Sequence, residues 1–369
     1  MNRIDATRPD SPLLAGPGPF VVGVSTRVLT DPARLDPYTG GREPRVLTVE
    51  VWYPAASGTR AGGVYQTLLR DGVTPTTLHG RAARGAVPAP GRWPLVLISH
   101  GYPGNRLLMS HLAEALASRG YLVAAADHPQ STYADLGDFG ATLYQRPLDQ
   151  AFLLRALADD PLADPDHAAI IGYSMGGYGA LISAGAALAP GTETHEAAPP
   201  GGALACHQVP DVPPGLQAVI AIGPWGNARG FWTADTLAGV RVPLLVMAGS
   251  RDDTSDYPAM RGIAQAARGT LLTFENAGHN AAAPIPAPAE SHPHSAALGW
   301  APFLHYADAV WDSVRMNALA QHFAAAFLDR HLKGETGRDA LLDPATALTE
   351  AAGFGPGTDA GLSLESWRG

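Results

Sequence analysis

Short apolar runs alternate with helix-like segments along most of the chain. Apolar residues dominate each run, which is typical of strands buried on both faces of a parallel sheet. Between two of these runs, Leu108, Leu112 and Leu116 recur at a four-residue step and Gly120 follows, as in a helix with a C-terminal glycine. The runs are residues 94–99, 122–126, 168–171, 218–222, 242–248 and 270–275. This alternation predicts an α/β fold, in which helices cover both faces of a mostly parallel sheet.

The two ends of the pattern differ from its middle. Residues 20–28 and 46–53 are early strand candidates joined by a turn-rich connection, and we expect them to form an antiparallel start to the sheet. Residues 308–332 carry apolar side chains at steps of three and four and are followed by Gly334, which predicts a long final helix. Another helix is expected over residues 147–157. Pro147 at its start is compatible with a helix, because proline is tolerated in the first helical turn.

The 369 residues are expected to form one domain spanning residues 1–369. Three irregular insertions, 127–146, 190–216 and 280–306, leave the carboxyl ends of predicted strands. Ligands of α/β sheets bind at that edge, so we expect the insertions to form pocket walls. Residues 335–369 are expected to be an irregular C-terminal tail.

The segment Gly172-Tyr173-Ser174-Met175-Gly176-Gly177 follows one apolar run and precedes a stretch of small residues. A G-x-S-x-G sequence at this place predicts a strand, a sharp turn and a helix with Ser174 at the apex. Glycine at 172 and 176 removes side chains that would collide with the backbone around such a turn. Because this pattern also arises by chance in a glycine-rich chain, the hypothesis of a serine nucleophile needs partners elsewhere.

Two candidate partners for Ser174 follow later strands, in the chain order that this motif requires: first the acid, then the histidine. His279 lies on the loop after residues 270–275, where an imidazole can act as general base toward the serine. Asp252 follows residues 242–248, and a carboxylate there would fix the histidine tautomer and stabilise the imidazolium. Asp253 and Asp256 are close enough to compete for this role.

The loop at residues 100–105 follows the strand 94–99 and contains two glycines. An oxyanion hole needs backbone N–H groups aimed at the developing negative charge, and glycine lets a chain turn so that its amides face the site. The two donors are assigned to the amides of Tyr102 and Met175. The alternative is a simple turn at the end of a strand.

Aromatic residues near the predicted strand ends are candidates for substrate binding. Tyr102, Trp225 and Trp232 are expected to line the pocket, with His128 near its mouth. The alternative is that they are ordinary core or surface side chains.

No cofactor or metal is expected. His292, His294 and His305 lie close in sequence, but no carboxylate–histidine pattern at zinc-ligand spacing accompanies them. Neither a P-loop nor a dinucleotide-binding G-x-G-x-x-G is present.

Charge and composition narrow the partners and the location. The net charge is −9 and the 25 basic residues are spread out, so nucleic acid is not expected to bind. The single cysteine, Cys206, excludes an internal disulfide. The first residues lack the apolar core of a signal peptide, and no run approaches the ~20 apolar residues that span a bilayer. A cytoplasmic location without membrane contact is therefore the default expectation.

The motifs together resemble the α/β-hydrolase superfamily, and more narrowly its bacterial dienelactone-hydrolase-like and platelet-activating-factor-acetylhydrolase-like esterases. The segments that carry the resemblance are residues 99–105, 172–177, 248–253 and 275–280. The resemblance implies the α/β-hydrolase fold with a sheet of about eight strands, a serine hydrolase without cofactor, and ester substrates. True dienelactone hydrolases have cysteine at the elbow, so Ser174 argues against that reaction. The elbow and Tyr102 are also similar to bacterial cutinases and polyester hydrolases, which are secreted and usually disulfide-bonded.

The function expected from the sequence is hydrolysis of small-molecule carboxylic esters through an acyl-enzyme, with Ser174, His279 and Asp252 as catalytic triad. An amide or peptide hydrolase with the same triad is the alternative within enzymes, because pocket shape decides between the two bonds. A noncatalytic binding protein on the same fold is the alternative outside enzymes. The residues fix neither the ester nor the oligomeric state.

Overall fold

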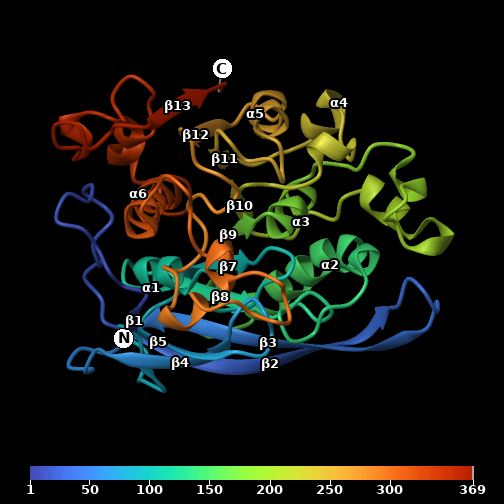
Figure 1. The fold of residues 1–369 in the computed structure, drawn as a ribbon, viewed down its shortest axis with the longest axis horizontal. Coiled ribbons are helices and arrows are strands. Elements are labelled where there is room, and N and C mark those ends of the chain that lie inside the picture. The colour runs from blue at the N-terminus through green and yellow to red at the C-terminus, as the bar shows by residue number, and fades with distance from the viewer. Residues whose placement is uncertain (368–369) are drawn as a thin grey trace.

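The described part of the chain, residues 1–367 of a computed structural model, is organised around one ten-stranded sheet (Figure 1). Its strands are β2 (Val22–Leu35), β3 (Arg42–Pro54), β6 (Ala83–Arg84), β7 (Trp93–Ser99), β8 (Leu122–Ala126), β9 (Ala163–Tyr173), β10 (Leu216–Ile222), β11 (Leu244–Gly249), β12 (Thr270–Phe274) and β13 (Leu362–Ser366). Their order across the sheet is β13-β12-β11-β10-β9-β7-β8-β3-β2-β6. Strands β7 to β12 pair parallel to one another, whereas β3 pairs antiparallel with both β2 and β8. The predicted mostly parallel sheet with an antiparallel start is confirmed, and the short edge strands β6 and β13 extend it beyond eight.

Helices cover both faces of this sheet, as predicted. They are α1 (Ser110–Ala117), α2 (Phe139–Ala158), α3 (Met175–Ser183), α4 (Ala234–Leu237), α5 (Tyr257–Ala266) and α6 (Ser313–Leu332). Figure 1 shows α1 and α6 on one side of the sheet and α2 and α3 on the other. Side chains alternate between two cores: Ile171 packs with α1 and α6, while its neighbour Ile170 packs with α2, α3 and α5.

A second, three-stranded sheet lies outside the main one and was not predicted. Its strands are β1 (Asn2–Arg3), β4 (Gly63–Leu68) and β5 (Pro75–Gly80), in the order β1-β5-β4. The turn of the β4–β5 hairpin, residues 69–74, reaches the region where the central strands end. The remaining short elements are 3-10 helices at Thr192–Thr194, Pro200–Gln208, Asn227–Arg229, Ala289–Ser291, Pro302–His305, Thr336–Leu341 and Glu350–Ala352.

Helix α2 starts earlier than the sequence predicts. It begins at Phe139 rather than at Pro147, so it includes the last part of the expected 127–146 insertion. Pro147 lies inside the helix and has no N–H for the carbonyl of Leu143, four residues before it. The hydroxyl of Tyr178 donates to that carbonyl at 3.3 Å instead. A tertiary contact thus replaces the missing helical hydrogen bond.

The segment expected to be an irregular tail contains a strand. β13 pairs antiparallel with β12 and covers the edge of the sheet, and Arg261 of α5 forms an ion pair with Glu365 of β13 at 2.6 Å. Its partner strand is remote in sequence, so local pattern gave no sign of it. None of the helices within residues 1–367 combines the length and apolar character that crossing a membrane requires.

Several histidines are buried, and burial lowers the pKa of each of them. The pKa of His111, His128 and His207 falls to about 4 and that of His322 to about 3, while His100 lies well below its ordinary value. The folded protein holds these rings neutral where the unfolded chain would protonate them.

We therefore expect the free energy of unfolding to fall as the pH drops from about 6.5 toward 4. In that window the unfolded state binds more protons, and each such histidine contributes up to about 1.4 kcal/mol per pH unit. Urea unfolding at pH 7.5, 6 and 5 measures the slope, and His111→Gln should reduce it. A free energy of unfolding that does not change over this range would contradict the prediction.

Candidate active site

Ser174 stands at a sharp turn between the end of β9 and the start of α3. Its φ of 51° and ψ of −110° are strained for a residue with a side chain. A Cβ on Gly172 would lie 2.2 Å from the carbonyl oxygen of Gly176, and a Cβ on Gly176 would lie 2.0 Å from that of Ser99. Strands β7 and β9 and helix α3 therefore meet in backbone contact, which only glycine permits at these two positions.

His279 bridges Ser174 and Asp252. Its Nε2 lies 3.0 Å from the Ser174 Oγ, and its Nδ1 lies 2.8 Å from the Asp252 Oδ2. The other oxygen of Asp252 accepts the backbone N–H groups of Thr254 and Ser255, each at 2.9 Å. The Asp252 side chain is almost fully buried and Ser174 is 8% exposed. This arrangement allows an imidazole to take the serine proton while a carboxylate holds its far nitrogen.

The competing acids have other roles. The side chain of Asp256 accepts the N–H of Ala259 at 2.9 Å and caps α5. The carboxylate of Asp253 is reached by the hydroxyl of Thr254 at 3.5 Å. Of the three candidates, Asp252 is the one whose carboxylate contacts His279.

The loop that carries His279 is tied to the 280–306 insertion and its flank. The amide of Gly278 donates to Asp308 at 2.7 Å, and the side chain of Asn280 donates to the carbonyls of Leu304 and Ala307. The Tyr173 ring lies 5.2 Å from the His279 ring, centroid to centroid. Sequence analysis missed these positioning residues, since their partners are distant along the chain.

The two residues whose amides are assigned to the oxyanion hole line the same cavity as Ser174 and come from different elements. Tyr102 follows β7 and Met175 is the first residue of α3. Among the described residues, neither amide donates to another protein group, so both remain available to a ligand. The first turn of a helix also favours negative charge. The pair can therefore stabilise an oxyanion formed next to Ser174.

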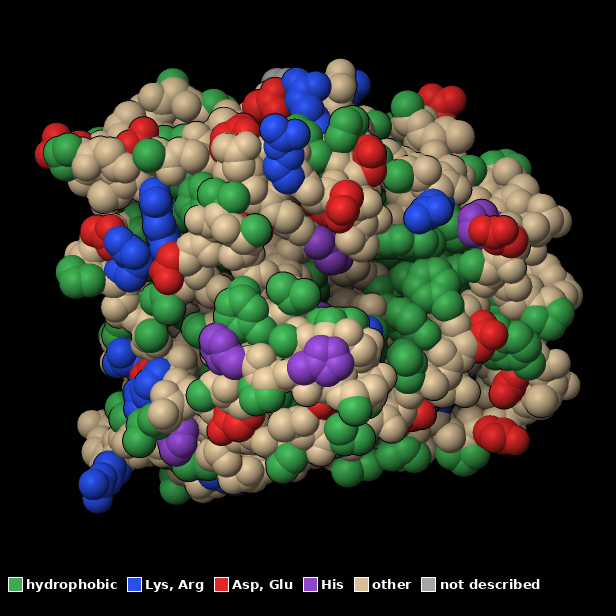
Figure 2. Space-filling view, viewed as in Figure 1, with side chains coloured by type: hydrophobic (Ala, Val, Ile, Leu, Met, Phe, Trp, Pro, Cys, Tyr) green, Lys and Arg blue, Asp and Glu red, His purple; other side chains and the backbone are tan. Residues whose placement is uncertain are grey.

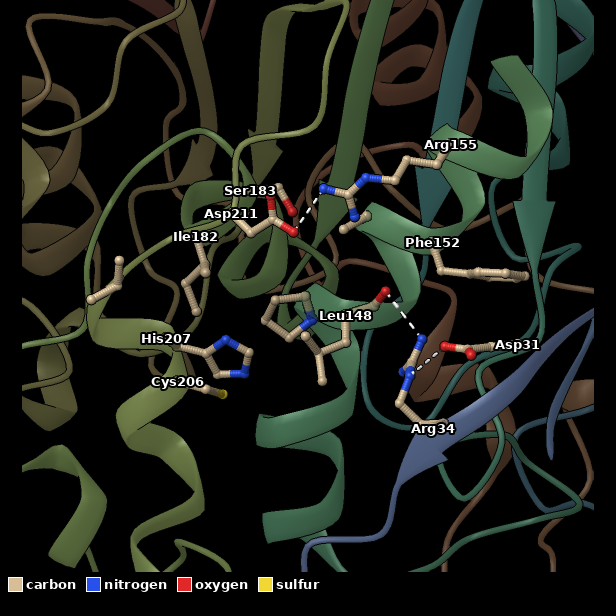
Figure 3. Close-up of a pocket in the computed structure, with 13 residues that line it drawn as sticks. Asp31, Arg34, Leu148, Phe152, Arg155, Ile182, Ser183, Cys206, His207 and Asp211 are labelled. Carbon is tan, nitrogen blue, oxygen red and sulfur yellow. Dashed lines mark hydrogen bonds and ion pairs between the residues drawn. The ribbon is translucent and has the colours of Figure 1, made fainter. Parts of the chain in front are cut away.

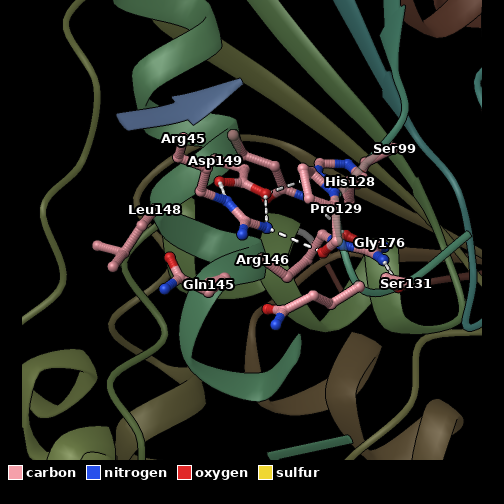
Figure 4. Close-up of polar contacts among 12 residues, drawn as sticks. Arg45, Ser99, His128, Pro129, Ser131, Gln145, Arg146, Leu148, Asp149 and Gly176 are labelled. Carbon is pink, nitrogen blue, oxygen red and sulfur yellow. Dashed lines mark hydrogen bonds and ion pairs between the residues drawn. The ribbon is translucent and has the colours of Figure 1, made fainter. Parts of the chain in front are cut away.

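A buried arginine supports the loop that carries Tyr102 (Figure 4). The Arg146 guanidinium, from α2, donates to the carbonyl of His100 and to the Ser131 hydroxyl. Next to it, the side chain of Gln150 donates to the carbonyl of Gly176 at 2.9 Å. Helix α2 thus holds both the loop after β7 and the first turn of α3.

His128 belongs to this buried cluster and does not line the mouth of the cavity, which corrects the prediction. Its Nδ1 lies 3.0 Å from a carboxylate oxygen of Asp149 and its Nε2 lies 3.0 Å from the Ser99 Oγ (Figure 4). Burial would raise the pKa of Asp149, but Arg45 and His128 outweigh it and hold that pKa well below its usual range. These two contacts hold the His128 ring in the core, away from the cavity.

A cavity of about 680 Å³ opens above Ser174. The face of the molecule in Figure 2 is hollowed near its centre, with hydrophobic side chains gathered along one side of the hollow. The residues that line the cavity are Arg70, Gly101, Tyr102, Pro103, Phe139, Tyr173, Ser174, Met175, Trp225, Thr254, His279, Asn280, Trp300, Leu304 and His305. Phe139 joins the aromatic wall on one side, its ring 5.0 Å from Tyr102 and 5.1 Å from Trp225. Tyr102 and Trp225 are thus among the residues that line this cavity.

Trp232 does not line this cavity, which is a second correction. It is 4% exposed and its ring packs 5.5 Å from that of Tyr178, in the core behind Trp225. Sequence analysis missed several other lining residues, among them Arg70, Phe139 and Trp300. They lie on a hairpin, a helix start and an insertion, and these segments come together only in the tertiary fold.

The histidines considered as metal ligands contact different residues. His292 packs against Phe303, and His305 shares a 2.7 Å hydrogen bond with the Tyr133 hydroxyl. Within residues 1–367, no group of three or more His, Cys, Asp or Glu side chains is placed to hold a metal ion.

A second cavity, of about 250 Å³, lies between α2 and the 190–216 insertion (Figure 3). Cys206 and His207 line one side of it, and Arg34 and Asp31 face them across it (Figure 3). Ser174, His279 and Asp252 do not contribute to its lining, so it is separate from the candidate active site.

Comparisons with known proteins agree with this fold. The family described as Platelet-activating factor acetylhydrolase, isoform II, matches residues 64–135, which include the loop after β7. No curated protein matches the sequence at a significant level. Among solved structures, a ferulic acid esterase from Streptomyces cinnamoneus is similar with a TM-score of 0.58 and 22% identity, over 90% of this chain and 94% of that one.

The chain therefore has the α/β-hydrolase fold, as predicted. The predicted resemblance to platelet-activating-factor-acetylhydrolase-like esterases is confirmed by the family match, which covers residues 64–135. Both matches are to ester hydrolases by their descriptions: the matched family is named as an acetylhydrolase and the similar structure as an esterase.

The backbone contact at the elbow predicts a large cost for a single methyl group. Gly176→Ala should lower the free energy of unfolding by about 1–3 kcal/mol, because the new Cβ would overlap the Ser99 carbonyl. Gly337→Ala is the matched control, since a Cβ at Gly337 meets nothing within 4 Å. Denaturant unfolding measures both, and equal stabilities for the two variants would contradict the account of the elbow.

Proposed function

We propose that this protein is a serine esterase in which Ser174 is the nucleophile, His279 the general base and Asp252 the acid of a catalytic triad. The observation that carries the proposal is the continuous pair of hydrogen bonds from the Ser174 hydroxyl through His279 to Asp252, at 3.0 and 2.8 Å. That pair lies at the floor of a cavity large enough for a small-molecule ester.

In the first half of the reaction, the Nε2 of His279 accepts the proton of Ser174 as the Oγ attacks the ester carbonyl carbon. The amides of Tyr102 and Met175 stabilise the oxyanion of the tetrahedral intermediate. Asp252 keeps the proton on Nδ1 and stabilises the imidazolium. When the intermediate collapses, His279 passes its proton to the leaving alcohol and an acyl-enzyme remains.

In the second half, water replaces the alcohol. His279 removes a proton from the water as its oxygen attacks the acyl carbon, and the same two amides hold the second oxyanion. Collapse returns the proton to the Ser174 oxygen and releases the carboxylic acid. One ester and one water give one alcohol and one acid, and the enzyme is restored.

The walls of the cavity favour esters with an apolar or aromatic portion. Tyr102, Phe139 and Trp225 present ring edges and faces along one wall, and no carboxylate side chain is part of the lining. Burial of apolar substrate surface against such a wall contributes about 25 cal/mol per Å².

Replacing the nucleophile tests the proposal directly. Ser174→Ala should lower turnover of p-nitrophenyl butyrate by up to about 10⁶-fold, because the variant lacks the attacking oxygen. Its thermal unfolding should stay close to that of the parent, and a fluorophosphonate probe should label the parent alone. Turnover by the variant close to that of the parent would refute the assignment.

The choice of triad acid is tested by a matched pair. Asp252→Asn should lower kcat by roughly 10⁴-fold, because an amide in place of the carboxylate no longer holds the required histidine tautomer. Asp253→Asn removes the same charge one residue away and should leave kcat within about twofold. Steady-state kinetics on the same ester measure both, and the reverse order of effects would assign the role to Asp253.

A further inference from the structure

One wall of the active-site cavity carries a cation from an unexpected element. Arg70 lies in the turn between β4 and β5 and lines the cavity together with Trp300 and His305 of the 280–306 insertion. It comes from the small outer sheet, whereas the proposed catalytic residues come from the ends of central strands.

The turn that carries Arg70 is held firmly in place. The neighbouring carboxylate of Asp71 accepts the Thr74 amide at 2.9 Å and the Ser295 hydroxyl at 3.0 Å, which joins the hairpin to the 280–306 insertion. A Cβ on Gly72, whose φ is +71°, would lie 2.2 Å from the carbonyl oxygen of Tyr133. The hairpin tip is thus packed between two insertions.

The Arg70 guanidinium has no carboxylate partner among residues 1–367, whereas Arg34 and Arg106 each form an ion pair with an aspartate. No ion pair is formed by its side chain, and Asp71 is already engaged as described. No aspartate or glutamate lines the cavity. Burial lowers the pKa of Arg70, and the groups that act against this shift are the side chains of Tyr133, Tyr306 and Tyr102. A partly desolvated cation without a counter-ion is unfavourable until an anion joins it.

The geometry of the guanidinium suits a planar anion. Its Cζ lies 5.9 Å from the centroid of the Trp300 ring, within the range of a cation–π contact. A guanidinium that stacks through its face keeps its N–H fork for bidentate binding of a carboxylate. The chain as a whole has a net charge of −9, so the protein does not attract anions in general. The cation at this position is therefore not part of a broad anion-attracting surface.

We propose that Arg70 binds a carboxylate on the part of the substrate that does not react, so that the preferred substrates are half-esters carrying a second, free carboxyl group. This inference rests on the proposed esterase function and adds the substrate class. The bound carboxylate keeps its charge and its bonds; water adds only across the ester. Arg70 is in this account a specificity-determining residue, outside the proton transfers of the triad.

Two matched substrate pairs test the inference, one for each side of the ester bond. 4-Acetoxybenzoate is compared with 4-acetoxybenzamide, and monomethyl terephthalate with methyl 4-carbamoylbenzoate; in each pair an amide replaces the carboxylate at nearly the same size. We expect the parent to favour the carboxylate in at least one pair by about 10- to 100-fold in kcat/KM, since a charge-assisted hydrogen bond distinguishes its members.

Variants of Arg70 assign the preference to its charge. Arg70→Gln should reduce the carboxylate-to-amide ratio of kcat/KM to near one, and Arg70→Lys should retain part of it, because lysine keeps the charge without the fork. Arg60→Gln is the matched control: Arg60 is exposed, precedes β4 and does not line the cavity, so the ratio should stay at the parent value.

Binding without turnover separates this inference from the proposed function. Calorimetry with Ser174→Ala should detect 4-acetoxybenzoate, and the added Arg70→Gln substitution should weaken that binding by about 10-fold or more. A parent that cleaves the amide-bearing esters through Ser174 but shows no preference for a carboxylate in either pair would overturn the role of Arg70 and leave the esterase function standing. Stronger Arg70-dependent inhibition by phenyl phosphate than by benzoate would overturn the assignment to a carboxylate. Full activity of Ser174→Ala would instead refute the proposed function itself.

Discussion

The close approach of three backbone segments at Ser99, Gly172 and Gly176 is the constraint on which the site depends. It lets α3 begin directly at the end of β9, so Ser174 projects from a turn with no room to relax. The strain in the φ of Ser174 is held by the parallel pairing of β7 with β9 and β9 with β10. Those same strands deliver Tyr102 and the loops next to His279, so the geometry of the sheet sets the geometry of the site.

A buried cluster of charges supports that arrangement from below. Asp149 accepts hydrogen bonds from Arg34, Arg45 and His128, and Arg146 uses its own donors on the loop after β7. Placing so many charges in a core costs desolvation energy that a hydrophobic core would avoid. In exchange, donors with fixed directions hold the backbone carbonyls of His100 and Gly176.

Sequence reasoning was informative about the parts of the molecule that short local motifs specify. The elbow, the loop after β7 and the positions of Asp252 and His279 follow from short motifs placed after buried strands, and the geometry brings the three side chains into contact. His128 was misplaced because its environment is set by Asp149, a residue on another element. Trp232 was misplaced because a tryptophan after a strand end suits a pocket or a core equally well, and only packing against Tyr178 decides.

The sequence specifies the residues of the cavity in two different ways. This explains why the groups proposed to react were easier to predict than the residues that line the walls. The groups proposed to react stand at strand ends, where motif spacing fixes them, whereas Arg70, Phe139 and Trp300 come from a hairpin, a helix start and an insertion. Substrate-binding walls built on loops and insertions differ between proteins of one fold while the sheet stays the same. Among the described residues, the cavity lining combines apolar aromatic side chains, which suit hydrocarbon, with a guanidinium that has no ion pair, which suits negative charge. A ligand with both features satisfies each wall, and a fully apolar one leaves the guanidinium without a counter-ion.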